Sequence, residues 1–217
     1  MQNGFAFGGL LMNNKIYKIG LTGPSGAGKS RFAHYFTCMG IPVLDADKIY
    51  HSLVNTETEC LSELGQEFGK ELIEGGRLNR RGLREIVFAE DGKEKLKRLN
   101  EITHKHVIKR TNELICELYG DGHRVFVIDA PLLIEAGMHR DCDTVISVTA
   151  SPEVRCERLM LRDGVTKEDA MLAINAQKPD SFYEKESDHI IKNEGSTGRL
   201  EDEFRKLYAR LGLNQRR

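Results

Sequence analysis

The stretch IYKIGLTGPSGAGKSRFAHYFTCMG, residues 16–40, decides the fold of this chain. The apolar run at 16–21 predicts a strand, and residues 28–39 predict a helix that Gly40 ends in a left-handed cap. Between them, residues 23–30 match G-x-x-x-x-G-K-[ST] at every fixed position. Because this phosphate-binding motif requires a strand before it and a helix after it, we expect an α/β fold of the P-loop NTPase type.

The loop is expected to bind a nucleoside triphosphate through backbone amides that point inward at phosphate oxygens. The free amides that begin the following helix favour the same anion. Lys29 should reach the β- and γ-phosphates and the Ser30 hydroxyl should bind magnesium, whereas Arg31 contributes its backbone amide. The expected ATP-binding residues are Gly23, Ser25, Gly26, Ala27, Gly28, Lys29, Ser30 and Arg31.

The rest of the chain alternates strand-like and helical runs, which is typical of a parallel sheet flanked by helices. Further strands are expected at 43–45, 125–128, 144–148 and 190–191, making a five-stranded parallel sheet. Residues 48–119 have helical spacing and no convincing strand, so they predict a helical insertion. Later helices are expected after Ser151, from Thr166 to Gln177, and over 200–211.

These runs divide the chain into four parts. The expected parts are an N-terminal extension (1–14), a nucleotide-binding core (15–47, 120–152 and 180–217), a helical acceptor-binding insertion (48–119) and a short helical lid (153–179). Translation starting at Met12 would remove most of the extension.

Composition narrows the class of protein. The 217 residues include 32 Lys and Arg against 33 Asp and Glu, which argues against a broad nucleic-acid surface. The apolar run 5–12 is too short to cross a membrane, which takes about 20 residues. Five widely spaced cysteines without a C-x-x-C pair predict reduced thiols in a cytoplasmic protein. Nothing in the sequence implies a partner protein.

Two carboxylates, Asp45 and Asp47, follow the second strand. Ligands bind at the carboxyl ends of parallel strands, so this pair should face the phosphate loop. If the strand continues, Ala46 between them places both side chains on one face. One carboxylate can then accept or orient the proton of an attacking hydroxyl. The alternative is that Asp47 only caps the next helix.

Several further blocks occur in a specific order, of which D-A-D and P-L-L are more distinctive than the phosphate loop. The blocks are I-G-L-T-G-x-x-x-x-G-K-S (19–30), G-I-P-V-L-D-A-D (40–47), F-G (68–69), L-N-R-R-x-L-R-x-x-V-F (78–88), L-N-x-I-T-H (99–104), A-P-L-L-I-E (130–135), R-L-x-x-R-D-G (158–164) and A-Q (176–177). In these blocks the chain resembles the dephospho-CoA kinase family over nearly its whole length. Arg31 stands where that family usually has Thr, and Lys105 where it commonly has Pro.

The resemblance implies ATP- and Mg²⁺-dependent phosphorylation of the ribose 3′-hydroxyl of dephospho-CoA, giving CoA and ADP. It implies that Asp47 is the catalytic base and that Asp45 supports it, through a magnesium-bound water. The insertion would bind the acceptor, with Arg84 and His104 as candidate contacts.

Three arginines, Arg155, Arg158 and Arg162, are spaced i, i+3 and i+7 and so share a helix face. Arg158 and Arg162 match the family motif and are expected to close over ATP and stabilise the transferring phosphoryl group. Arg155 is expected at the surface. Asp129 ends an apolar run, where a magnesium-linked acid and a structural residue are equally good interpretations.

Two other functions are compatible with a phosphate loop. One is a kinase for another small alcohol, such as a nucleoside or a sugar. The other is a regulator that binds ATP only as a switch, although the carboxylates opposite the loop favour chemistry.

Overall fold

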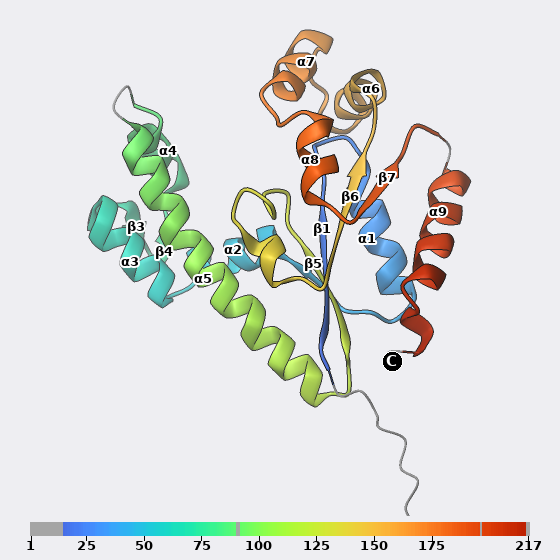
Figure 1. The fold of residues 1–217 in the computed structure, drawn as a ribbon. Coiled ribbons are helices and arrows are strands. Elements are labelled where there is room, and N and C mark those ends of the chain that lie inside the picture. Colours follow the sequence, from blue (N-terminus) through green and yellow to red (C-terminus); the bar gives the residue numbers. More distant parts are fainter. Residues whose placement is uncertain (1–14, 90–91, 196, 216–217) are drawn as a thin grey trace, which may run out of the picture.

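The computed structural model describes residues 15–89, 92–195 and 197–215. The expected extension (1–14) and the Met12 start lie outside these residues. Five parallel strands form the central sheet in the order β2-β5-β1-β6-β7 (Figure 1). The strands are β1 Tyr17–Thr22, β2 Val43–Asp45, β5 Val125–Asp129, β6 Thr144–Thr149 and β7 His189–Lys192. The predicted P-loop type of α/β fold with five parallel strands is confirmed.

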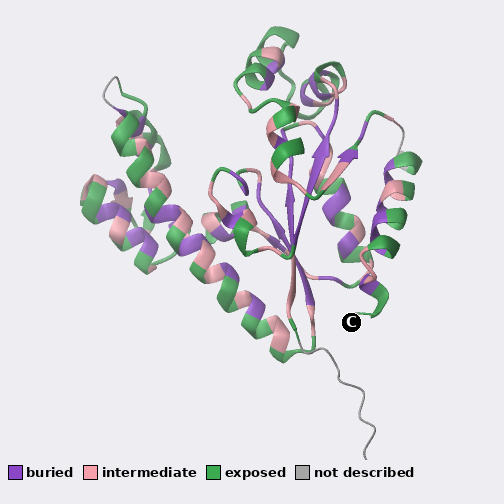
Figure 2. Cartoon of the chain, in the orientation of Figure 1, coloured by how far each residue is buried: buried purple, intermediate pink, exposed green. Residues whose placement is uncertain are grey.

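Helices cover both faces of the sheet, so β5 and β6, the two strands on either side of the central β1, are buried at every position (Figure 2). On one face, α1 (Lys29–Cys38) and α9 (Thr197–Arg210) pack Phe32, Phe36 and Phe204 against β1. The opposite face packs against α2 (Ala46–Asn55) and α5 (Gly92–Gly120). The two sides of the sheet therefore build two separate cores.

The chain between β2 and β5 is mainly helical, as predicted, and holds α2, α3 (Glu59–Phe68), α4 (Arg80–Val87) and α5, with a 3-10 turn at Lys70–Leu72. The expectation that it has no strand is wrong. Two strands of two residues each, β3 (Ile73–Glu74) and β4 (Arg77–Leu78), pair antiparallel and form a hairpin. Gly75 and Gly76 make its turn with φ of 56° and 74°, and strands this short show no period in the sequence.

The last third of the chain holds α6 (Pro152–Asp163), α7 (Lys167–Asn175) and α8 (Asp180–Glu186). Thr166 caps α7 by accepting a hydrogen bond from the Asp169 amide at 3.1 Å, as predicted. Ser151 occupies the N-cap of α6, but its side chain makes no capping bond. Gly40 takes φ 72° just after α1, which confirms the predicted cap.

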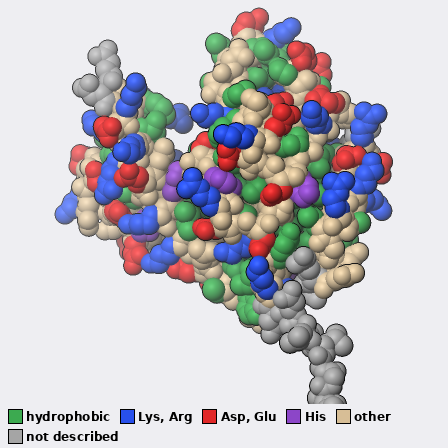
Figure 3. Space-filling view, viewed as in Figure 1, with side chains coloured by type: hydrophobic (Ala, Val, Ile, Leu, Met, Phe, Trp, Pro, Cys, Tyr) green, Lys and Arg blue, Asp and Glu red, His purple; other side chains and the backbone are tan. Residues whose placement is uncertain are grey.

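Three features that were expected from the composition can be compared with the structure: the mixture of charges on the surface, the apolar length of the helices and the state of the cysteines. Figure 3 shows Lys and Arg side chains interspersed with Asp and Glu over the visible face. Among the described residues, no helix combines the length and apolar character that a membrane crossing needs. All five cysteines are free.

Candidate active site

The phosphate loop joins β1 to α1 at the carboxyl edge of the sheet. Gly28, the N-cap of α1, has φ 99°, and a Cβ there would lie 2.3 Å from Asn193 Nδ2, so the position requires glycine. The loop walls a cavity of about 470 Å³. This cavity is lined by Gly23, Pro24, Ser25, Gly26, Gly28, Lys29, Ser30, Asp47, Pro131, Arg158 and Arg162.

Two residues predicted to bind ATP do not line this cavity. The Ala27 side chain is fully buried, and the Arg31 side chain is exposed at the start of α1. Neither side chain therefore faces the cavity, and in this structure the two backbone amides donate to the carbonyls of Pro24 and Gly28 at 3.2 and 3.1 Å.

Lys29 forms an ion pair with Asp129, and only 14% and 7% of their side chains are exposed. Burial raises the pKa of Asp129, while the Lys29 ammonium lowers it. Asp129 ends β5 and lies in register with Asp45 on β2. Asp129, for which magnesium binding and a structural role were equally good interpretations, is thus the ion-pair partner of Lys29 in this structure.

Arg155 holds the loop in place, so its predicted surface position is wrong. It is 4% exposed, and its guanidinium donates to the Ser25 carbonyl at 2.9 Å and to Gln177 Oε1 at 2.5 Å. The same Gln177 oxygen accepts a hydrogen bond from the Ser25 amide at 3.1 Å. Helical spacing predicted the shared face of the arginines, but which neighbour that face meets depends on how α6 packs.

Arg158 also bonds to the backbone of the loop. Its Nη1 donates to the carbonyls of Gly26 and Ala27, both at 3.2 Å. Asn193 Nδ2 donates to the same Ala27 oxygen at 2.7 Å. A trans peptide points its C=O and the following N–H in opposite directions. Bonding of the Ala27 carbonyl therefore fixes the orientation of the peptide unit that carries the Gly28 amide.

Arg162, one helical turn further along α6, lies at the rim of the cavity. Its guanidinium makes two hydrogen bonds of 2.7 Å to Asp163, and 62% of the side chain is exposed. Exposure therefore increases along α6, from the buried Arg155 in its first turn to the exposed Arg162 in its last turn.

The two carboxylates after β2 have different positions from those expected. The strand ends at Asp45 and α2 begins at Ala46, so the two side chains do not share a strand face. Asp45, rather than Asp47, is the cap of α2, because its Oδ1 accepts the Lys48 amide at 3.0 Å. Asp47 lies in the first turn and faces the loop cavity.

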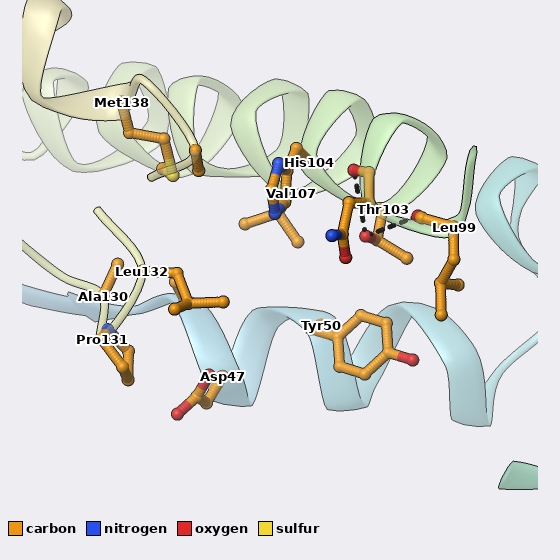
Figure 4. A pocket seen from close by; sticks show the side chains of 13 residues that line it. Asp47, Tyr50, Leu99, Thr103, His104, Val107, Ala130, Pro131, Leu132 and Met138 are labelled. Carbon is orange, nitrogen blue, oxygen red and sulfur yellow. Dashed lines mark hydrogen bonds between the residues drawn. The ribbon is translucent and has the colours of Figure 1, made fainter. Parts of the chain in front are cut away.

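A second, apolar pocket of about 270 Å³ lies between α2 and α5 (Figure 4). It is lined by Ala46, Asp47, Tyr50, Leu99, Asn100, Thr103, His104, Val107, Ala130, Pro131, Leu132, Ala136 and Met138. Burial disfavours a charged imidazole at His104 and lowers its pKa. Asp47 and Pro131 line both cavities, so the carboxylate stands where the two meet.

The structure brings most of the predicted residues together, but not all of them. Arg84 has an exposed side chain on α4 and lines neither cavity. Asn193 was missed, since its bond to Ala27 spans 166 residues of sequence. Gln177 was matched only as part of the A-Q block, without a role.

A family model described as dephospho-CoA kinase matches residues 17–199. The chain belongs to the dephospho-CoA kinase family. The dephospho-CoA kinase of Listeria innocua is 37% identical over 198 residues, which cover 91% of this chain and 98% of that protein. That of Corynebacterium glutamicum is 35% identical, over 90% of this chain and 100% of its own. As a member of a kinase family, the chain is an enzyme, and the switch interpretation is wrong.

Solved structures agree with this assignment to the dephospho-CoA kinase family. A Thermus thermophilus protein superposes with a TM-score of 0.74 and 31% identity, over 91% of this chain and 98% of its own. The dephospho-CoA kinase of Campylobacter jejuni gives 0.65 and 27%, over 89% and 96%. A shikimate kinase from Bacteroides thetaiotaomicron gives 0.53 at 16% identity, over 90% and 98%, and shows only that the fold is shared.

Proposed function

We propose that this kinase transfers the γ-phosphoryl group of ATP to the ribose 3′-hydroxyl of dephospho-CoA, giving CoA and ADP in coenzyme A biosynthesis. One observation carries the proposal: Asp47 lines both the loop cavity and the apolar pocket. A carboxylate at this junction meets a phosphate chain from one side and an acceptor hydroxyl from the other. Phosphoryl transfer needs a group that positions the hydroxyl and takes its proton.

The loop cavity supplies the phosphate side. The amides at the start of α1 and the Lys29 ammonium bind the β- and γ-phosphates. Arg158, held on the loop carbonyls, and Arg162, at the rim, offset the negative charge of the transferring group. Most of the catalysis on this side is positioning and charge stabilisation.

Magnesium fits the donor set of the site. The described ranges contain no cluster of three or more His, Cys, Asp or Glu that would hold a metal alone. Mg²⁺ usually takes only one or two protein oxygens beside substrate phosphates. The Ser30 hydroxyl is the proposed direct ligand and Asp45 the proposed indirect one. When bound, Mg²⁺ neutralises charge on the phosphates.

On the acceptor side, Asp47 is the proposed general base. The apolar pocket next to it binds the nucleoside end of the acceptor, with His104 in its wall. The helical segment from α2 to α5 is thereby the acceptor-binding part and α6 with α7 the lid. Arg84 lies outside the pocket, and it remains a predicted contact for the parts of the acceptor that extend beyond the pocket.

Purified protein mixed with Mg-ATP and dephospho-CoA tests the proposal, with ADP release followed by a coupled assay and CoA identified by mass. We expect Asp47→Asn to lower the rate by about 10²–10⁴-fold. ATP affinity, measured by calorimetry, should stay within a few fold, because the loop contacts are unchanged.

Asp121→Asn is the matched control, since Asp121 is an exposed carboxylate in the turn after α5. It should leave the rate unchanged. Near-normal turnover in Asp47→Asn would remove the base assignment. Folded, ATP-binding protein that forms no CoA would overturn the substrate.

A further inference from the structure

The apolar pocket between α2 and α5 has a lining that contains no Lys or Arg, and Asp47 is its one acidic residue. A diphosphate would be poorly bound there, because it would lose hydration without gaining a cation. On the proposed function, the acceptor carries a diphosphate on one side of its ribose and an adenine on the other. The lining therefore selects against the diphosphate.

The position of the reacting hydroxyl limits which part of the acceptor can reach the pocket. When the 3′-hydroxyl lies at Asp47, the adenine is attached to the same furanose ring. The adenine can therefore reach only the immediate neighbourhood of the Asp47 carboxylate. The apolar pocket is that neighbourhood on the side away from the phosphate loop. At about 270 Å³ it is near the lower end of small-molecule pockets, which suits one ring system and part of a sugar.

The walls suit a flat base. In Figure 4, Val107 projects from α5 and Tyr50 from α2 into the space between the two helices, and Leu132 lies to one side of it. Such surfaces cover the faces of a ring, while its edge keeps polar atoms that must be hydrogen-bonded when buried.

Asn100 and His104 are one helical turn apart on α5 and line the pocket. Among the described residues, neither side chain is hydrogen-bonded to another group of the protein. The Thr103 hydroxyl, between them, is already bonded to the carbonyls of Leu99 and Asn100 in its own helix (Figure 4). The Asn100 carboxamide therefore has its donor and acceptor free for a ligand.

We propose that this pocket binds the adenine base of the acceptor and that the Asn100 carboxamide recognises the edge of that base. A carboxamide donates one hydrogen bond and accepts another, which matches the ring nitrogen and amino group that adjoin on adenine. Asn100 is thus a specificity-determining residue for the acceptor and has no part in ATP binding.

The test compares dephospho-CoA with an analogue that has hypoxanthine in place of adenine, which turns the amino donor into a carbonyl acceptor. Wild-type enzyme should prefer the adenine acceptor by about tenfold or more in kcat/KM. Asn100→Leu should raise KM for dephospho-CoA by about tenfold or more and lose most of this preference, with KM for ATP within twofold.

Asn100→Asp is a near-isosteric second variant, which keeps the fold if leucine disturbs it. Its carboxylate accepts but does not donate, so it should also lose much of the preference. Asn112→Leu, on the same helix but bonded to Lys18, is the control and should behave as wild type.

Equal loss of activity toward both acceptors in Asn100→Leu, or no change in KM, would overturn the proposal. So would a wild-type enzyme that is active on dephospho-CoA but indifferent to the base, and this result leaves the proposed function intact. Wild-type enzyme that forms no CoA at all would overturn both.

Discussion

Burial disfavours a charged His104, a residue of α5 that lines the apolar pocket. Its half-buried ring loses hydration, which penalises the charged form and lowers its pKa below the ordinary 6.5. A neutral imidazole fits an apolar wall better than a cation does. The same burial couples folding to pH.

The unfolded chain takes up a proton at His104 as pH falls through about 6.5, whereas the folded chain resists it. Stability from this residue is therefore complete above that pH and decreases as pH falls. We expect His104→Gln to flatten the decline in free energy of unfolding between about pH 7.5 and about pH 5.5. Urea denaturation measures this slope, and the exposed His34→Gln is the control. An unchanged slope in His104→Gln would contradict the assignment.

At the scale of an element, α6 is tied to the phosphate loop at its base and exposed at its tip. Arg155 and Arg158 bond to carbonyls of residues 25–27, while Arg162 is at the cavity rim. The helix therefore serves two purposes, since its first turns hold the loop and its last turn places Arg162 at the rim of the cavity.

Arg155→Met should raise KM for ATP by about tenfold or more, because the Ser25 carbonyl and the Gln177 amide lose a charged donor. The effect on kcat should be smaller, since Arg155 lines neither cavity. Steady-state kinetics separate the two constants, and Arg155→Lys should restore part of the ATP affinity. Arg81→Met, on the exposed face of α4, is the control. Unchanged KM in Arg155→Met would show that the loop holds its shape without this clamp.

At the scale of the whole molecule, the sheet and the helical segment each contribute to one of two neighbouring cavities. The phosphate loop follows β1, whereas the apolar pocket is walled largely by α2 and α5. Asp47 comes from the start of α2, where that segment leaves the sheet. Donor and acceptor are therefore expected to bind side by side rather than in turn.

Two neighbouring cavities predict that the stabilising effects of ADP and dephospho-CoA add. Each ligand at about 100 times its Kd contributes about 2.7 kcal/mol, so the pair should contribute about twice that. Thermal or urea unfolding with each ligand alone and with both measures this. Lys29→Ala should lose most of the ADP effect and keep that of dephospho-CoA. A combined effect no larger than either single one would mean that the ligands compete for one cavity.

The sequence alone determined the first strand, the phosphate loop and the first helix. It also determined the positions of the four later strands of the sheet. The helical character of residues 48–119 was predictable too, apart from one short hairpin. These features depend on neighbours in the chain: glycine spacing, apolar period and capping residues. The phosphate-loop motif picked out Lys29, and the family resemblance picked out Asp47 and His104; all three line one or both of the cavities.

Only the tertiary structure decided which groups hold the loop and which carboxylate faces it. Arg155 lies buried against Ser25, 130 residues away, and Asn193 bonds to Ala27 across 166. Asp45 caps α2 and Asp47 faces the cavity, since the helix starts one residue after the strand instead of letting the strand continue. A helical period predicts which residues share a face. The packing of distant elements decides what that face meets, and no local pattern encodes it.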